Sequence, residues 1–359
     1  MHSAFARILL AAAFLCIVPA TAAPMPAPKD MAIDAATRKS VIEGVIGRLH
    51  QHYVFPETAA RVEAVLRTRL NDGAYDQITS ARQFAQTLSK TLIETAGDRH
   101  MRVRYWPTPI VHGFEPEDDP KAYQEALAQE AHADHGVTRV ERMSGNIGYL
   151  KIDVFPPAAF VSDVYASAMR LLNGTDALII DLRDNRGGEP DAVALMESYF
   201  FDQPTLMNTV FERRTGKARE YWTTRDIKGP AYGQSKPIYI LTSKYTFSGG
   251  EDLSYSMRAR VRATLVGETT GGGANPGDMR RVQAHFSVFI PDGRAINPVT
   301  GTNWEGVGVS PDIAVAPAEA LSTARILALK AVMATAQDAR QRTELATLLE
   351  RETAGSAQK

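Results

Sequence analysis

Apolar residues recur at helical spacing in the part of the chain that precedes residue 100. Three segments, at residues 41–49, 60–70 and 84–93, place them three or four positions apart, which predicts three consecutive amphipathic helices. The pattern stops at residues 96–98 and changes to alternation over residues 99–105, which is typical of a strand. The sequence therefore predicts a small helical bundle that leads into a strand, with His100 at the junction.

A different rhythm follows, in which short apolar runs alternate with helical segments. Strands are predicted at residues 147–152, 177–182, 238–241, 264–267 and 282–290. Helices are predicted at residues 161–172, from about Pro190, and from Ser248. Alternation of strand and helix favours a largely parallel sheet with crossover helices, and the nearly continuous apolar run at residues 177–182 indicates a strand buried on both faces.

These patterns divide the chain into five predicted parts. They are a signal peptide at residues 1–22, an N-terminal helical domain at 30–105, a connector at 106–140, an α/β core at 141–317 and a C-terminal helical tail at 318–353. Apolar positions of the tail predict that it packs either on the core or on a second copy of the chain, so a homo-oligomer stays open.

The first residues have the composition of an export signal. Arg7 precedes an apolar stretch at residues 8–18 that is too short to span a bilayer, and residues 20–22 are a small-residue cleavage site. We therefore expect a periplasmic or secreted protein with no stable membrane span after cleavage. Cys16 is the only cysteine, so the cleaved protein would use neither a disulfide nor a thiol nucleophile.

Composition narrows the range of partners. The formal net charge is -1 and no long basic run occurs, so nucleic acid is not an expected partner. His132 and His135 are three residues apart, but no further ligand lies at suitable spacing, and we expect neither a metal nor a cofactor.

One serine lies where a predicted strand turns into a predicted helix, in the segment Thr246-Phe247-Ser248-Gly249-Gly250-Glu251. Two interpretations are open. As a nucleophile, Ser248 would gain from the small residues at the bend and from helix-start N–H groups that stabilise a nearby oxyanion. As a helix N-cap, it would form a capping box with Glu251.

Two glycine-rich segments lie near this serine in the predicted topology. Gly187 and Gly188 follow the strand at residues 177–182, where they form either a plain turn or, with the N–H of Gly249, an oxyanion hole. Residues 271–277 lack the lysine and hydroxyl of a phosphate-binding loop, and we expect a mobile loop beside a substrate cleft. A lone histidine at the position of His100 is usually a hydrogen-bonded structural residue, and Glu305 taken alone is explained as an exposed loop carboxylate.

The order of these motifs resembles that of the carboxyl-terminal processing (tail-specific) serine peptidase family, over about residues 40–317. The chain is most similar to the branch that contains the tricorn core protease and the interphotoreceptor retinoid-binding protein modules. The matching segments are Gly97-Asp98-Arg99-His100, Asp181-Leu182-Arg183-Asp184-Asn185-Arg186-Gly187-Gly188, Thr246-Phe247-Ser248-Gly249-Gly250-Glu251, Gly267-Glu268-Thr269-Thr270-Gly271-Gly272-Gly273 and Glu305-Gly306-Val307-Gly308-Val309-Ser310-Pro311-Asp312-Ile313.

The resemblance implies an α/β (α+β) fold, with a Clp-protease/crotonase-like core preceded by a small helical bundle. It also implies roles for individual residues. Ser248 matches the nucleophile, His100 the general base and Glu305 the acid of the site, while the backbone of Gly249, Gly187 and Gly188 matches the oxyanion donors.

The chain departs from the family at several points. No lysine occurs at residues 271–275, where the processing branch has its base, so a Ser-Lys dyad is not expected. Arg99 stands where the tricorn branch has a serine, which leaves open how Glu305 reaches His100, and Met101 replaces the usual threonine. Residues 106–146 are too few for a PDZ domain, so the resemblance implies a member without one.

Two functions follow as alternatives. The first is an exported serine hydrolase, most simply a peptidase, that acts on a peptide or protein substrate through an acyl-enzyme. The second is a non-catalytic binding protein that carries an apolar ligand, a retinoid or fatty acid, on the same scaffold.

Overall fold

The computed structural model describes residues 29–111, 120–121, 124–125 and 136–356. The predicted signal peptide and the pair His132 and His135 lie outside the described residues. Within these ranges, no helix is both long enough and apolar enough to cross a membrane.

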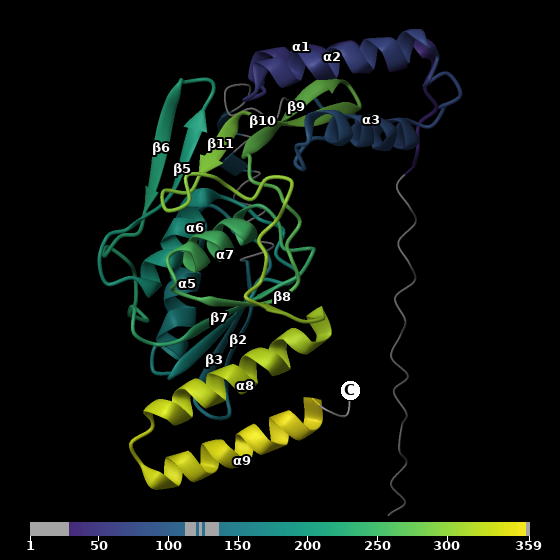
Figure 1. The fold of residues 1–359 in the computed structure, drawn as a ribbon. Helices are drawn as coiled ribbons and strands as arrows, with labels where there is room; N and C mark the ends of the chain where they lie inside the picture. The colour runs from purple at the N-terminus through teal and green to yellow at the C-terminus, as the bar shows by residue number, and fades with distance from the viewer. Residues whose placement is uncertain (1–28, 112–119, 122–123, 126–135, 357–359) are drawn as a thin grey trace, which may run out of the picture.

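The three N-terminal helices predicted from periodicity are confirmed. They are α1 (Ala35–His52), α2 (Pro56–Asn71) and α3 (Ala81–Ala96), and they lie side by side at one end of the molecule (Figure 1). Asp34 and Ser80 cap α1 and α3 through their side chains. Gly97 ends α3 in the left-handed conformation, with φ 74°, and turns the chain towards His100.

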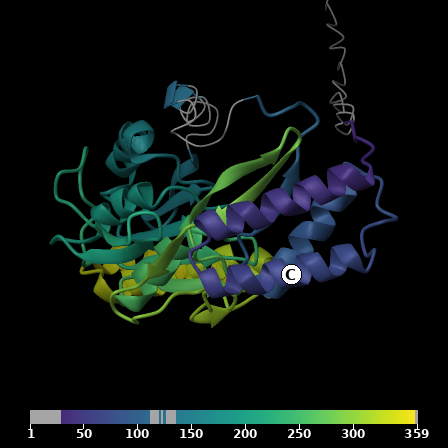
Figure 2. The ribbon, with the colours of Figure 1, turned by 90° about the horizontal axis from the view of Figure 1, so that it is seen from above.

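A small antiparallel sheet packs against these helices. Its order is β1 (Arg102–Tyr105), β10 (Phe286–Pro291) and β9 (Gly277–Gln283), and Figure 2 shows the β9–β10 hairpin running alongside the helices. Phe286, Val288 and Ile290 share one buried core with the helices. A segment from late in the chain therefore completes the N-terminal part.

The single strand predicted at residues 282–290 is wrong. The structure has a hairpin there, with a turn at Ala284 and His285 between β9 and β10. Neither turn residue is a glycine, asparagine or proline, so the usual sequence signal for a hairpin is missing.

The core contains a six-stranded sheet, which confirms the largely parallel sheet predicted. Its order is β12 (Ile313–Ala314), β8 (Thr264–Gly267), β7 (Ile238–Thr242), β4 (Ala177–Asp181), β3 (Ile147–Ile152) and β2 (Val137–Met143). The pairs from β12 to β3 are parallel, and β2 is an antiparallel edge strand. β2 lies partly within the segment predicted as a connector. Its residues are polar and half-exposed, so its sequence lacks the apolar pattern of a buried strand.

Helices cover both faces of this sheet (Figure 1). One face packs against α5 (Ala158–Leu172), α6 (Pro190–Glu197) and α7 (Gly249–Ala259), and the other packs against α8 (Pro317–Thr335) and α9 (Ala339–Ser356). Alternate residues of β4 belong to the two separate cores, which is why its sequence is continuously apolar. The helical tail therefore docks on the core of its own chain.

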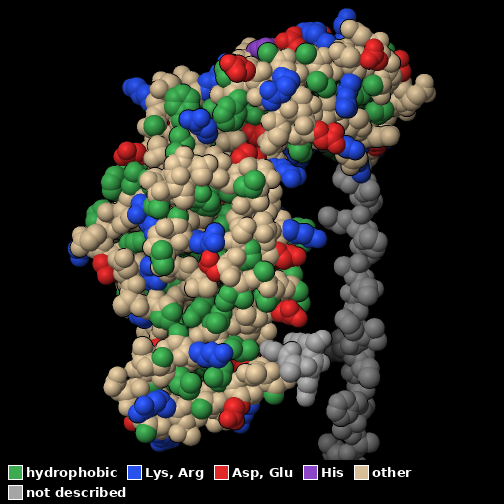
Figure 3. Space-filling model, in the orientation of Figure 1, with side chains coloured by type: hydrophobic (Ala, Val, Ile, Leu, Met, Phe, Trp, Pro, Cys, Tyr) green, Lys and Arg blue, Asp and Glu red, His purple; other side chains and the backbone are tan. Residues whose placement is uncertain are grey.

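A third, antiparallel sheet of β11 (Gly293–Ile296), β5 (Leu206–Glu212) and β6 (Lys217–Trp222) was not predicted. It projects from the core beside the helical part (Figure 1). The short helix η1 (Ser198–Phe200) leads into it. On the face drawn in Figure 3, basic and acidic side chains are interspersed. The predicted fold class, a mixed α/β core preceded by a small helical bundle, is confirmed.

Candidate active site

Ser248 lies on a sharp turn between β7 and α7. Its backbone has φ 52° and ψ -117°, a conformation that a residue with a side chain rarely adopts. Glu251 forms a capping box with Ser248, in which its carboxylate accepts a hydrogen bond from the Ser248 N–H at 2.9 Å. The capping prediction is therefore confirmed, and it is compatible with a second role for the hydroxyl because the strained turn itself is unexplained by capping.

The glycine turn after β4 lies directly against this serine. Gly187 and Gly188 have φ 99° and 133°, and a Cβ atom on Gly187 would lie 2.5 Å from the Cβ of Ser248. The N–H of Gly187 donates to Asn185 Oδ1 at 2.8 Å, so it is already used. Among the described residues, the N–H groups of Gly188 and Gly249 have no hydrogen-bond partner. A Cβ on Gly249 would lie 3.2 Å from the Gly188 nitrogen, so the two turns are adjacent.

His100 lies in the turn between α3 and β1, as predicted. Its ring packs between Phe247, at 4.7 Å between centroids, and Phe289, at 5.5 Å. The residue is only 4% exposed, and its Nδ1 is buried with no hydrogen-bond partner in the described part of the chain. Burial, assisted by the charge of Arg102, lowers the pKa of His100 to about 3, so the imidazole is neutral at ordinary pH.

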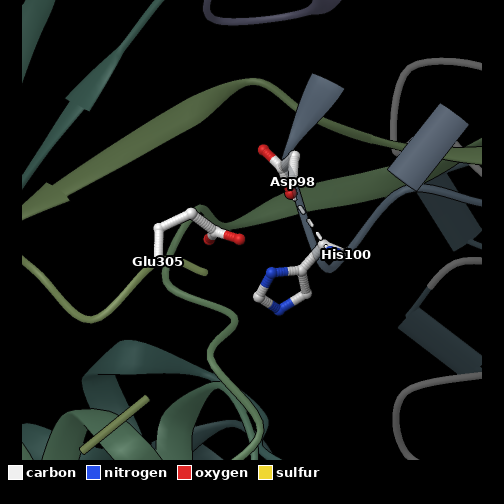
Figure 4. A group of neighbouring side chains, drawn as sticks. All are labelled: Asp98, His100 and Glu305. Carbon is white, nitrogen blue, oxygen red and sulfur yellow. Dashed lines mark hydrogen bonds between the residues drawn. The ribbon is translucent and has the colours of Figure 1, made fainter. Parts of the chain in front are cut away.

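Two carboxylates lie beside this imidazole, from Asp98 and Glu305 (Figure 4). One nitrogen of His100 and one oxygen of each acid lie within 4.8 Å of one another. The Glu305 carboxylate accepts hydrogen bonds from the backbone N–H groups of Arg99 at 2.8 Å and Ala274 at 2.6 Å. Glu305 is thus held beside the histidine by backbone N–H groups, one of which belongs to Arg99.

Asp98 was not predicted as a site residue, although it belongs to the quoted Gly97-Asp98-Arg99-His100 segment. It is 1% exposed and accepts hydrogen bonds from Tyr53 Oη, Asn275 Nδ2 and the His100 N–H. Burial and the nearby Glu305 raise the pKa of Asp98 to about 7, and burial also raises that of Glu305. A buried and a half-buried acid this close disfavour a second negative charge.

The same three side chains have the composition and spacing of a metal-binding group. One imidazole and two carboxylates would suit a zinc or similar ion, although a separation of up to 4.8 Å would have to shrink for them to share one. Their carboxylate oxygens are largely occupied by protein donors, which fits an acid–base role for the group better than a metal role.

The glycine-rich loop at residues 271–275 is tied in place. The buried Glu251 carboxylate accepts hydrogen bonds from Thr270 Oγ1 at 2.5 Å and from the N–H groups of Gly272 at 2.6 Å and Gly273 at 2.9 Å. Residues 272–275 are themselves buried. The prediction of a mobile loop is therefore wrong for this part, because acids distant in sequence bind its backbone.

Ser248 and His100 line one cavity of about 740 Å³. Its walls come from the turn after β4, from the β5–β6 hairpin and from the sheet of the N-terminal part, and they include Gly188, Tyr221, Phe247 and Phe289. Folding therefore brings together the predicted serine, histidine and glycines, with Glu305 behind the histidine.

Comparisons with known proteins match both the N-terminal part and the core of the chain. Residues 146–315 match the model of peptidase family S41, and residues 33–140 match that of the N-terminal domain of peptidase S41 in eukaryotic IRBP. The chloroplastic carboxyl-terminal-processing peptidase 2 of Arabidopsis thaliana is 28% identical over 177 residues, 47% of this chain and 32% of that protein. The carboxyl-terminal-processing protease of Synechocystis is 30% identical over 131 residues, 36% of this chain and 29% of that protein.

The matched region thus spans about a third of the length of these relatives. A solved lipoprotein from Streptococcus agalactiae shares the fold, with a TM-score of 0.51 at 14% identity over 82% of this chain and 96% of that one. The two family models together cover most of the chain, and they agree with the order of motifs and with the fold. The chain belongs to peptidase family S41, a family of serine peptidases.

Proposed function

We propose that this chain hydrolyses peptide bonds by acyl transfer, with Ser248 as the nucleophile and His100 as the general base. The observation that carries the proposal is the meeting of a serine on a strained strand-to-helix turn with a neutral imidazole in one cavity. The two residues are separated by almost 150 positions in sequence, and the packing of the His100 ring on Phe247 brings them to the same cavity.

The chemistry follows the established serine-hydrolase pattern. Nε2 of His100 takes the proton of Ser248 Oγ as the oxygen attacks the substrate carbonyl, and it then returns that proton to the departing amine. Water, deprotonated by the same nitrogen, attacks the ester carbonyl of the acyl-enzyme, and the imidazolium returns the proton to Ser248 Oγ as the acid product leaves. Nε2 is the nitrogen assigned to this step because Nδ1 is buried beside the carboxylates.

The oxyanion of each tetrahedral intermediate would bind the N–H groups of Gly249 and Gly188. Both groups are free within the described structure and lie beside Ser248, whereas the Gly187 N–H is bound to Asn185. Gly187 therefore contributes by leaving room for the Ser248 side chain, while the N–H group of Gly188 serves as the oxyanion donor from this turn.

Glu305 and Asp98 would together stabilise the imidazolium that forms on His100. No hydrogen bond joins Nδ1 to either acid in the unliganded site, and such contacts commonly tighten when substrate binds. A single negative charge shared by the two acids is enough for this role.

Export to the periplasm or the exterior is part of the proposal and rests on the composition of residues 1–22. The alternative of an apolar-ligand carrier has less support. Charged side chains of Arg102, Arg186, Glu189, Glu212 and Arg219 line the cavity, whereas a retinoid or fatty-acid site would be mainly apolar.

Labelling with a fluorophosphonate probe tests the proposal. We expect one adduct on Ser248, found by peptide mapping, and its loss in Ser248→Ala and on prior denaturation. A folded protein that carries no adduct on Ser248 and cleaves no peptide in a diverse library would refute the mechanism.

A further inference from the structure

A cationic side chain that the proposed mechanism does not use lies in the cavity, close to the histidine. Arg102 is the first residue of β1, two residues after His100, and its side chain lines the same cavity as Ser248. The alternation of β1 points Met101 and Val103 into the helical core and leaves Arg102 exposed on the cavity side. The register therefore fixes this charge at the site.

No anion within the described residues pairs with Arg102. Its guanidinium carbon lies 5.3 Å from the centroid of Phe289, over the ring, and neither an ion pair nor a hydrogen bond accompanies this contact. Arg280 in the same cavity differs, because it binds both Asp278 and Asp292. Stacking orients the planar guanidinium and leaves its donors free, a state suited to two-point binding of a carboxylate.

Phe289 also sets the distance between this cation and the catalytic machinery. Its ring lies 5.5 Å from the His100 ring and 5.3 Å from the Arg102 guanidinium. The imidazole and guanidinium therefore lie no farther apart than these two distances combined, which an extended peptide spans in about three residues. A peptide whose scissile carbonyl is at Ser248 can thus place a nearby anionic group on Arg102.

We propose that Arg102 is a specificity-determining residue that binds a carboxylate of the peptide substrate within about three residues of the scissile bond. The inference rests on the proposed peptidase function and adds the substrate class. The carboxylate belongs to an Asp or Glu side chain or to the C-terminus of the peptide. Pairing would also offset the positive charge that Arg102 directs at His100, which favours protonation of the base during catalysis.

Matched peptides test this inference. One set carries Asp or Asn at each of the three positions on either side of the cleavage site, and another ends in an α-carboxylate or an α-carboxamide three residues after it. We expect the full chain to favour the carboxylate member of a pair by about tenfold in kcat/KM. Preference in the first set identifies a side chain, and preference in the second identifies the C-terminus.

Arg102→Gln should reduce this ratio to about one, and Arg102→Lys should retain part of it because the charge remains. Arg104→Gln is the matched control, since Arg104 is on the same strand, stacks on Trp106 and lies outside the cavity lining. Equal cleavage of both members by the parent protein, or an unchanged ratio in folded Arg102→Gln, would overturn the inference.

Binding to Ser248→Ala separates this inference from the peptidase proposal. Fluorescence anisotropy with labelled peptides should show tighter binding of the carboxylate member, and that difference should vanish in Ser248→Ala with Arg102→Gln. A binding difference without any cleavage by the parent chain refutes the peptidase function alone. Cleavage without a binding difference or a kinetic preference refutes the role of Arg102 alone.

Discussion

At the scale of single residues, the backbone of Ser248 is a strained feature of the site. A non-glycine residue at φ 52° and ψ -117° costs about 1–3 kcal/mol, which surrounding contacts must offset. Glu251 supplies one such contact by binding the Ser248 N–H. The strain holds the side chain at the cavity, so stability and chemistry should be separable at this position.

Comparison of Ser248→Gly with Ser248→Ala should reveal this strain. Both variants lack the hydroxyl and should lose activity by about a thousandfold or more. Glycine adopts positive φ freely, so Ser248→Gly should be more stable than Ser248→Ala by about 1–2 kcal/mol in urea unfolding. Equal stability of the two variants would show that the turn relaxes when the side chain changes.

The acid pair beside His100 should control the pH dependence of catalysis. Burial and mutual repulsion raise the pKa of Asp98 to about 7, whereas His100 titrates far below this range. A negative charge on the pair stabilises the imidazolium, so kcat/KM should rise with pH through about 7. In Asp98→Asn, Glu305 loses its like-charged neighbour and its pKa falls, so the rise should move to lower pH.

Measurement of kcat/KM between pH 4.5 and 9 checks this expectation, and superimposable profiles of the parent and Asp98→Asn would contradict it.

The stability of the fold offers a second readout of the acid pair. An acid whose pKa is raised on folding stabilises the protein at low pH, and this contribution is lost as pH rises through the folded pKa near 7. The free energy of unfolding should therefore fall less between pH 5 and 8 in Asp98→Asn than in the parent.

The sequence indicates which side chains belong to the site, but it indicates less well which groups those side chains contact in the folded protein. Ser248, His100 and Glu305 stand in recognisable motifs, and folding brings them to one region. Asp98 stands in the same motif as His100, but its relevance depends on a contact with Glu305, more than 200 positions away. The use of the Gly187 N–H by Asn185 is, in contrast, a local contact between residues two apart, of the Asx-turn kind that an asparagine before glycine can indicate.

At the scale of elements, two turns after parallel strands build the site. The turn after β4 carries Gly187 and Gly188, and the turn after β7 carries Ser248. Adjacent parallel strands end at the same edge of the sheet, where such folds generally place their ligands. The close contact between Gly187 and Ser248 makes the fit of these two turns a condition for catalysis.

Gly187→Ala should disrupt this fit. An added Cβ would lie 2.5 Å from Ser248 Cβ, so we expect both a loss of stability of about 2–4 kcal/mol and a large loss of kcat. Gly216→Ala is a suitable control, because Gly216 also has positive φ, 64°, but has open space around its Cβ position. That control should lose only about 1 kcal/mol and no activity. Similar behaviour of the two variants would exclude a specific role for the Gly187 contact.

Element prediction succeeded where apolar periodicity was strong. The three N-terminal helices and the parallel strands were indicated by long or continuous apolar patterns. The strands β6 and β2 were missed because they are partly exposed and rich in charged residues, so burial does not mark them. The β9–β10 hairpin was read as one strand because alternation resumes after an inconspicuous turn.

At the scale of the whole molecule, stability and chemistry reside in different layers. The helices α8 and α9 pack on the face of the sheet opposite to α7, in a core separate from the one beneath Ser248. This layer contributes apolar burial against the sheet, and a hydrogen bond from Arg183 Nη1 to the Pro317 carbonyl also joins the start of α8 to the turn after β4. Away from that hydrogen bond, the tail should tolerate changes that alter stability without altering catalysis.

Leu329→Ala tests this separation. Leu329 is fully buried, so its truncation should cost about 2–5 kcal/mol, seen as a lower urea midpoint. The kcat/KM of the folded variant, measured well below its melting temperature, should equal that of the parent. Leu171→Ala, at a leucine that is 49% exposed, should change neither quantity appreciably. A fall in kcat/KM in folded Leu329→Ala would show that the tail influences the site.

The closing of the N-terminal sheet by β9 and β10 has a consequence for biogenesis. His100 leaves the ribosome early, but its ring is enclosed only when Phe247 and Phe289 arrive, and Glu305 follows later still. A growing chain therefore cannot complete the surroundings of His100 before residue 305 has been made. Under the proposed mechanism, activity would begin only when synthesis is nearly finished, which would protect neighbouring unfolded chains, and the enzyme itself, from premature cleavage.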